Sequence, residues 1–129
     1  MPQRYVVDAS ALLALLNQEP GAERVARAIS AGSFVSAVNF SEVVARLSDA
    51  GMPEPAVREA LDTLELNVVA FDRALGYRAG FLRPSTKRAG LSLGDRACLA
   101  LAQHDNLPAL TADRAWRQVA TGTRVEIIR

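Results

Sequence analysis

Short apolar runs alternate along the chain with longer segments in which apolar residues recur every three or four positions. The short runs are typical of β-strands, and the longer spacing is typical of amphipathic α-helices. Strands are predicted at residues 4–7, 34–38, 67–71, 108–111 and 124–128. Helices are predicted at residues 9–18, 22–31, 40–50, 53–64, 73–82, 92–105 and 113–120, with a polar loop at 83–90.

The regular alternation of strands and helices predicts the fold class. Such alternation favours an α/β domain in which a parallel sheet is covered by helices on both faces. We see no repeat and no linker, so we expect a single domain over residues 1–129. Right-handed crossovers place the functional crevice of such a domain outside the carboxyl ends of its strands.

Composition narrows the possible functions. Of the 129 residues, 50% are hydrophobic and 22% are charged, as in globular proteins, and the net charge of +1 does not by itself indicate a nucleic-acid binder. A single cysteine and a single histidine exclude an internal disulfide and leave almost no basis for a zinc site. Neither a leader pattern nor a long apolar stretch is present, so we expect a cytoplasmic protein without a membrane partner.

Four carboxylates follow the predicted strands. Asp8 ends the first strand, and Glu42 lies in the expected first turn of the helix after the second. Asp95 opens the helix at 92–105, and Asp113 follows the strand at 108–111. Because the carboxyl ends of parallel strands meet at one edge, we expect these four acids at the same rim of the sheet.

Asp95 raises a specific question about burial. Its helix is apolar from Ala97 onwards, and the spacing places Asp95 on the same face as Cys98, Leu99 and Ala102. A buried charge costs several kcal/mol unless a partner compensates it. The pattern therefore indicates that Asp95 faces a compensating group.

Each acid could instead be a helix cap. Asp8 and Asp113 could be simple N-caps, and the pairs Asn39–Glu42 and Ser92–Asp95 have the form of capping boxes. Acids are also favoured at the positive end of a helix. For any one of the four, capping alone would be a sufficient explanation.

Capping alone does not explain four acids at one rim, because their like charges repel unless they are protonated or neutralised. The rim turns contain no lysine, and Arg96 and Arg114 are the only arginines expected there, both pointing elsewhere. A hard divalent cation is the remaining neutraliser, and carboxylates without His or Cys suit Mg²⁺ or Mn²⁺. Such a site is suited to hydrolysis of a phosphodiester.

Four segments also carry a family resemblance: VVDASALLALL, NFSEVVARL, LSLGDRACLALA and LTADRAW. Together they resemble the acidic motifs of PIN-domain ribonucleases, most closely those of the VapC-like toxins of bacterial type II toxin–antitoxin systems. The resemblance implies a three-layer fold with about five parallel strands and an Mg²⁺- or Mn²⁺-dependent endoribonuclease. It further implies a cognate antitoxin, a homodimer, and a structured or single-stranded loop RNA substrate such as tRNA.

Carried over residue by residue, the resemblance assigns catalytic and metal-binding roles to Asp8, Glu42, Asp95 and Asp113. Ser10 and Thr111 would be polar supports close to the metal. Some relatives have a further acid after the fourth motif, where this chain has Arg114, Ala115 and Trp116. This departure leaves open whether one metal ion or two are held. Trp116 is expected to pack beneath the rim, although stacking on a base is an alternative.

A basic segment between the second and third motifs is a candidate RNA-binding surface, although a solvated surface would have the same composition. Its cations are Arg73, Arg78, Arg83, Lys87 and Arg88.

Two alternatives to a nuclease remain at this stage. A phospho-receiver domain shares the fold class and an acidic pocket, but it needs a lysine near the last strand, and the only lysine is Lys87. A non-catalytic PIN-like binding module is disfavoured only by the completeness of the acidic set.

Overall fold

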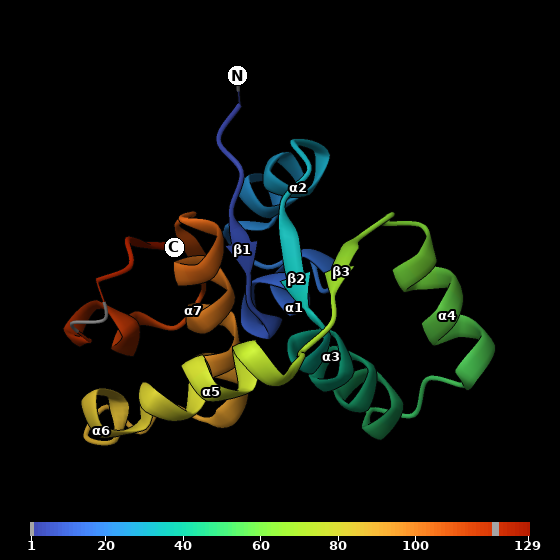
Figure 1. Ribbon diagram of the computed structural model, residues 1–129. Coiled ribbons are helices and arrows are strands. Elements are labelled where there is room, and N and C mark those ends of the chain that lie inside the picture. Colours follow the sequence, from blue (N-terminus) through green and yellow to red (C-terminus); the bar gives the residue numbers. More distant parts are fainter. Residues whose placement is uncertain (1, 120–121) are drawn as a thin grey trace.

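The computed structural model describes residues 2–119 and 122–129, and its centre is a five-stranded sheet (Figure 1). The strand order is β3-β2-β1-β4-β5, and every neighbouring pair is parallel. The predicted α/β class and the parallel sheet are therefore confirmed. The strands are β1 (Val6–Val7), β2 (Phe34–Ser36), β3 (Asn67–Val69), β4 (Ala109–Thr111) and β5 (Val125–Ile127).

The helices connect the strands as the apolar periodicity predicts, because each connection between parallel strands must cross one face of the sheet. In the described residues, the α-helices are α1 (Ala9–Leu16), α2 (Ala22–Ser30), α3 (Ala37–Asp49), α4 (Glu54–Asp62), α5 (Arg73–Phe81), α6 (Arg83–Thr86) and α7 (Leu93–Asp105). A short 3₁₀-helix, η1 (Arg114–Gln118), precedes β5. None of the described helices combines the length and the apolar character that crossing a bilayer requires.

Two hydrophobic cores lie on the two faces of the sheet, which makes the fold three-layered (Figure 1). Val7 belongs to the core shared with α1 to α4, whereas its neighbour Val6 belongs to the core shared with α5 and α7. Successive residues of a strand point to opposite faces, so the central strand β1 contributes to both cores. Its two valines are fully buried.

Two local expectations are wrong. The segment expected to be a polar loop at 83–90 begins with α6, where Pro84 occupies the first turn and the Thr86 hydroxyl donates to the Leu82 carbonyl at 2.8 Å. Proline is tolerated there because the first-turn N–H groups have no partner within the helix. The helix expected at 113–120 is the shorter η1, and Ala120 lies outside the described residues.

The start of α3 also differs from the prediction. Ser36 is its N-cap and accepts a hydrogen bond from the Val38 N–H at 3.2 Å. The proposed Asn39–Glu42 capping box is therefore wrong, and Glu42 lies in the second turn rather than the first.

Candidate functional site

A cleft of about 640 Å³ lies at the carboxyl edge of the sheet, and all four predicted acids line it. Asp8 comes directly after β1, and Asp113 follows β4, the neighbouring strand. Glu42 lies on α3, and Asp95 lies in the first turn of α7. The structure thus brings together four carboxylates that are far apart in the sequence.

Asp8 is the buried member of the set, with 3% of its surface exposed. Its carboxylate caps α1 by accepting a hydrogen bond from the Ala11 N–H at 2.9 Å, so the predicted N-cap is confirmed. Burial raises the pKa of Asp8 from 3.8 to about 6, although the hydrogen bonds from Thr111, Ala11 and Ser10 oppose that rise. The negative charge of Asp95 raises the pKa further. The ionised form of this side chain is therefore costly in the folded protein without a further compensating group.

Ser10 and Thr111, the expected supports, both donate to Asp8. The Ser10 hydroxyl lies 2.8 Å from Asp8 Oδ1, and the Thr111 hydroxyl lies 2.6 Å from Oδ2. The same two hydroxyls accept backbone N–H groups, Ser10 from Ala112 at 3.0 Å and Thr111 from Asp113 at 3.0 Å. They therefore couple the position of the loop after β4 to the carboxylate of Asp8.

Glu42 is held between α3 and α7. Asn39, three residues earlier, donates its side-chain amide to Glu42 Oε1 at 2.9 Å and to the Gly94 carbonyl at 3.0 Å. A Cβ at Gly94 would overlap the carboxylate of Glu42. The absence of a side chain at Gly94 therefore lets α7 approach α3 closely enough to place Glu42 beside the start of α7.

Asp95 takes part in the predicted capping box of α7. The Ser92 hydroxyl accepts from the Asp95 N–H at 3.2 Å, and the Asp95 carboxylate accepts from the Ser92 N–H at 2.9 Å. Capping uses one of its carboxylate oxygens. Asp113 likewise caps η1 by accepting from the Ala115 N–H at 2.9 Å, so the two roles of cap and cleft residue coexist.

Three of the four acids act electrostatically on Cys98 in the core. Burial raises the pKa of the Cys98 thiol well above its usual value, and the negative charges of Asp8, Asp95 and Glu42 add to that rise. In the described part of the chain, none of the four acids forms an ion pair with lysine or arginine. The cleft therefore carries negative charge that no bonded cation offsets.

The donor set fits a hard divalent cation. Its acidic side chains supply carboxyl oxygens, its lining includes no His or Cys, and the buried Asp8 has no ion-pair partner in the described residues. As the side chains stand, no three His, Cys, Asp or Glu groups among residues 2–119 and 122–129 are arranged as a complete metal site. Asp8 is held by three donors, so binding a cation would require the more exposed acids to move towards it.

Two arginines line the cleft that were not expected there. Arg46 follows Glu42 by one turn of α3, and Arg129 donates to Glu19 Oε1 at 3.4 Å and to the Pro20 carbonyl at 3.3 Å. The i, i+4 spacing from Glu42 could have indicated Arg46, whereas no local signal indicates Arg129. The expectation that Arg96 and Arg114 are the only arginines near the rim is therefore wrong.

Neither Arg96 nor Arg114 forms an ion pair with the four acids in the described residues, so neither neutralises them, as expected. Arg96 donates to the Ala79 carbonyl at 3.1 Å, and Arg114 donates to the Arg129 carbonyl at 3.4 Å. Trp116 is fully buried in the core on the α7 side, which excludes it as a platform for base stacking in this conformation.

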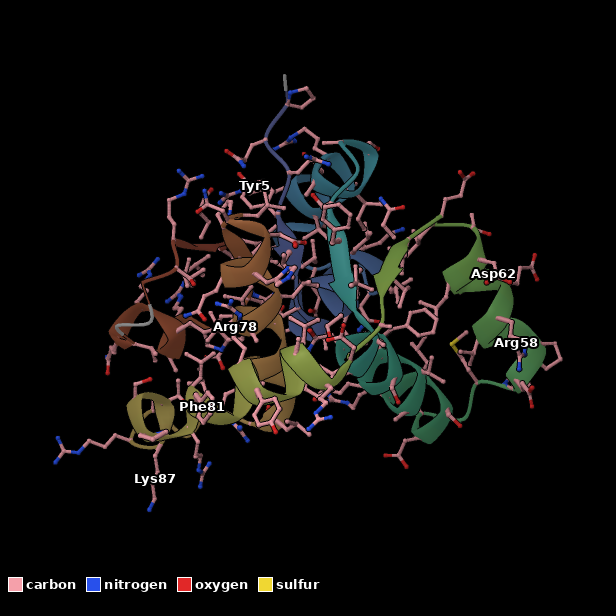
Figure 2. All side chains as sticks on the ribbon, viewed as in Figure 1. Tyr5, Arg58, Asp62, Arg78, Phe81 and Lys87 are labelled. Atoms are coloured by element: carbon pink, nitrogen blue, oxygen red, sulfur yellow. The ribbon has the colours of Figure 1, made fainter. Side chains whose placement is uncertain are left out.

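The basic segment lies outside the cleft lining, on α5, α6 and the residues that follow. All five of its cationic side chains are exposed. Figure 2 shows Lys87 extending away from the molecule beyond α6. The structure does not bring these residues together with the four acids.

Comparison with known proteins shows the family to which this chain belongs. The PIN domain family model matches residues 5–122. The chain belongs to the PIN domain family, and the resemblance carried by the four acidic motifs is confirmed. No curated protein sequence matches it.

Several solved structures share the fold. A DNA-bound VapBC from Salmonella typhimurium is 16% identical, with a TM-score of 0.78 over 99% of this chain and 100% of the other. A VapBC2 from Rickettsia felis, bound to a DNA fragment from its promoter, is 14% identical, with a TM-score of 0.76 over 96% and 98%. A toxin–antitoxin complex from Klebsiella pneumoniae is 19% identical, with a TM-score of 0.73 over 97% and 98%.

Proposed function

We propose that this chain is a metal-dependent endoribonuclease and the toxin of a type II toxin–antitoxin pair. One observation carries the proposal. The carboxyl group of Asp8 is buried, and its cleft is lined by three further acidic residues from separate elements, with no lysine or arginine bonded to any of the four in the described residues. Membership of the PIN domain family supports nuclease chemistry at this place in the fold.

The proposed ligands of Mg²⁺ or Mn²⁺ are Asp8, Glu42, Asp95 and Asp113. When bound, such an ion lowers the pKa of water and stabilises negative charge on phosphate oxygens. Asp8 provides the fixed anchor, because Ser10, Thr111 and the Ala11 N–H hold its carboxylate in place. Glu42 and Asp95 are less buried than Asp8, so their carboxylates can turn towards the ion and the substrate.

The toxin assignment rests on the neighbours in fold. Two of them are VapBC structures and a third is a toxin–antitoxin complex, and each is covered almost end to end by this chain. We therefore propose that a cognate antitoxin binds this chain and blocks the acidic cleft. A homodimer and a loop-containing RNA substrate such as tRNA remain parts of the same proposal.

A non-catalytic PIN-like binding module would use the same fold without a metal. The two candidates differ in what Asp95 does, because a pure cap and a metal ligand respond differently to loss of charge. Ser92 is the N-cap and Asp95 the third residue of α7, and Asn keeps an oxygen that can accept from the Ser92 N–H. If capping is its whole role, Asp95→Asn should therefore lower stability by only about 0.3–1 kcal/mol, through loss of a negative charge at the start of the helix. If Asp95 belongs to a repelling cluster, the same change should stabilise the metal-free protein.

The test is thermal unfolding of the parent and Asp95→Asn in EDTA and in Mg²⁺ or Mn²⁺ at constant ionic strength. The parent should gain about 1.4 kcal/mol at roughly ten times the dissociation constant, and the variant should gain much less. Cleavage of total cellular RNA by the parent in Mn²⁺, absent in EDTA, is the accompanying activity measurement. Equal metal shifts in the two proteins, or none in either, would refute the metal site.

A further inference from the structure

An exposed stripe of one arginine and two aromatic rings runs along α5, outside the acidic cleft. Arg73, Tyr77 and Phe81 follow one another at i, i+4 spacing and so share one helix face. The two rings stack with their centroids 6.0 Å apart and an interplanar angle of 28°, and the Arg73 guanidinium lies 5.8 Å from the centre of the Tyr77 ring. We call these three residues the aromatic stripe.

Large aromatic rings are unusual on the solvent-exposed face of an amphipathic helix. Phe81 is 77% exposed and Tyr77 is 56% exposed, while Leu75, Ala79 and Leu82 on the other side of the helix are buried in the core. Two of the four large hydrophobic side chains that are exposed in the described residues lie on the stripe. Clustered exposed apolar surface of this kind marks interaction sites.

The charge around the stripe indicates the chemistry of its partner. Residues 73–88 contain five cations and no aspartate or glutamate. All five are exposed, and none forms an ion pair with another described residue. Figure 2 shows Phe81 and Lys87 at the α5–α6 end of the molecule and Arg78 nearer to α7. A second copy presenting the same face would bring like charges together, so the surface favours an anionic partner.

The helix that carries the stripe packs with its buried face on α7, the helix that carries Asp95. Arg96, the neighbour of Asp95, donates to the Ala79 carbonyl of α5 at 3.1 Å. Figure 1 shows α5 crossing beside α7, with α6 continuing from it to the edge of the molecule. An extended ligand that lies along α6 and α5 therefore approaches the first turn of α7, where Asp95 lies.

We infer that the aromatic stripe stacks unpaired bases of single-stranded RNA while the surrounding cations hold its backbone on the way to the cleft. This inference rests on the proposed nuclease function. Exposed rings beside cations suit such a partner, because every base has a π-face and stacks without regard to sequence. The positioning residues of this substrate path are Tyr77 and Phe81, with Arg73 orienting the first ring.

The test measures binding of a fluorescent single-stranded RNA in EDTA, where the proposed cleavage does not occur, against an abasic oligonucleotide of the same length. The proteins are the parent, Tyr77→Ala, Phe81→Ala, and the ring-retaining pair Tyr77→Phe and Phe81→Tyr. Val68→Ala is a matched control, because Val68 is exposed but lies on β3 rather than on the stripe. Thermal unfolding of each variant establishes that it is folded.

The parent should bind the RNA about fivefold or more tightly than the abasic strand, and each Ala variant should lose most of that preference. The ring-retaining variants and Val68→Ala should keep it. Equal binding of the two strands by the parent, or a preference that survives Tyr77→Ala and Phe81→Ala, would overturn the inference. So would a dimer that Phe81→Ala turns into a monomer without changing the preference, because a second copy would then occupy the stripe. Metal-independent binding is separate from cleavage, so failure of the nuclease proposal would be seen only in the cleavage assay.

Discussion

Gly94→Ala should inactivate the protein without unfolding it. The added Cβ would overlap the carboxylate of Glu42, which must then retreat by on the order of 1 Å to reach van der Waals distance. Because that carboxylate is the end of a flexible side chain, it can move without disturbing the backbone. It would, however, lose the hydrogen bond from Asn39, which is 2.9 Å long in the parent.

The expected change in stability is small because two effects oppose each other. Replacing Gly by Ala stabilises a helix interior by about 0.8–1.0 kcal/mol, which is an upper bound for Gly94 in the first turn of α7, and loss of one hydrogen bond costs about 1 kcal/mol. The free energy of unfolding should therefore change by less than about 1 kcal/mol. RNA cleavage in Mn²⁺ should fall by on the order of 100-fold, because misplacing a catalytic group by 1 Å has an effect of that size.

The assay pairs urea unfolding with single-turnover cleavage of RNA, and the Glu42→Ala background supplies the control. If Gly94→Ala acts by displacing Glu42, it should reduce cleavage no further in a protein that already lacks that carboxylate. Gly76→Ala is the matched glycine control, because a Cβ at Gly76 meets nothing within 4 Å. Full activity in Gly94→Ala, or an equal loss in the Glu42→Ala background, would refute the reasoning.

Two further predictions concern the pH dependence of stability caused by Asp8 and the effect of the protein on bacterial growth. The raised pKa of Asp8, about 6 against 3.8 when unfolded, means that the folded state binds the proton more tightly, so Asp8 should lower the stability of the metal-free protein progressively between pH 4 and pH 7. Relative to Asp8→Asn, the parent should lose about 2 kcal/mol over that range in denaturant titrations, and parallel pH profiles would contradict the assignment. Induction of the chain alone should arrest growth of a bacterial host, and Asp8→Asn or Asp95→Asn should relieve the arrest. An Asp95→Asn protein that arrests growth as strongly at the same soluble level would show that the catalytic assignment is wrong.

Local signals in the sequence were sufficient to predict the alternation of strands and helices and the parallel sheet. They also predicted the capping roles of Asp8, Asp95 and Asp113. Hydrophobic periodicity and capping act over a few residues, so they can be recognised without knowing the fold. The order of acids after strands also predicted a shared rim, because parallel strands end at one edge. The start of α3 was missed because Ser36, still within the predicted strand, supplies the cap.

Only the tertiary structure decided how deeply each acid at the rim is buried, where its carboxyl group lies and which other residues surround the cleft. Burial raises the pKa of Asp8 while a hydrogen bond from Thr111, far away in the chain, opposes that rise. The position of Glu42 depends on how closely α7 approaches α3 at Gly94. Arg129 in the cleft and the open faces of Tyr77 and Phe81 likewise depend on which elements pack together. These features arise from contacts between distant segments, and no periodicity within a single segment specifies them.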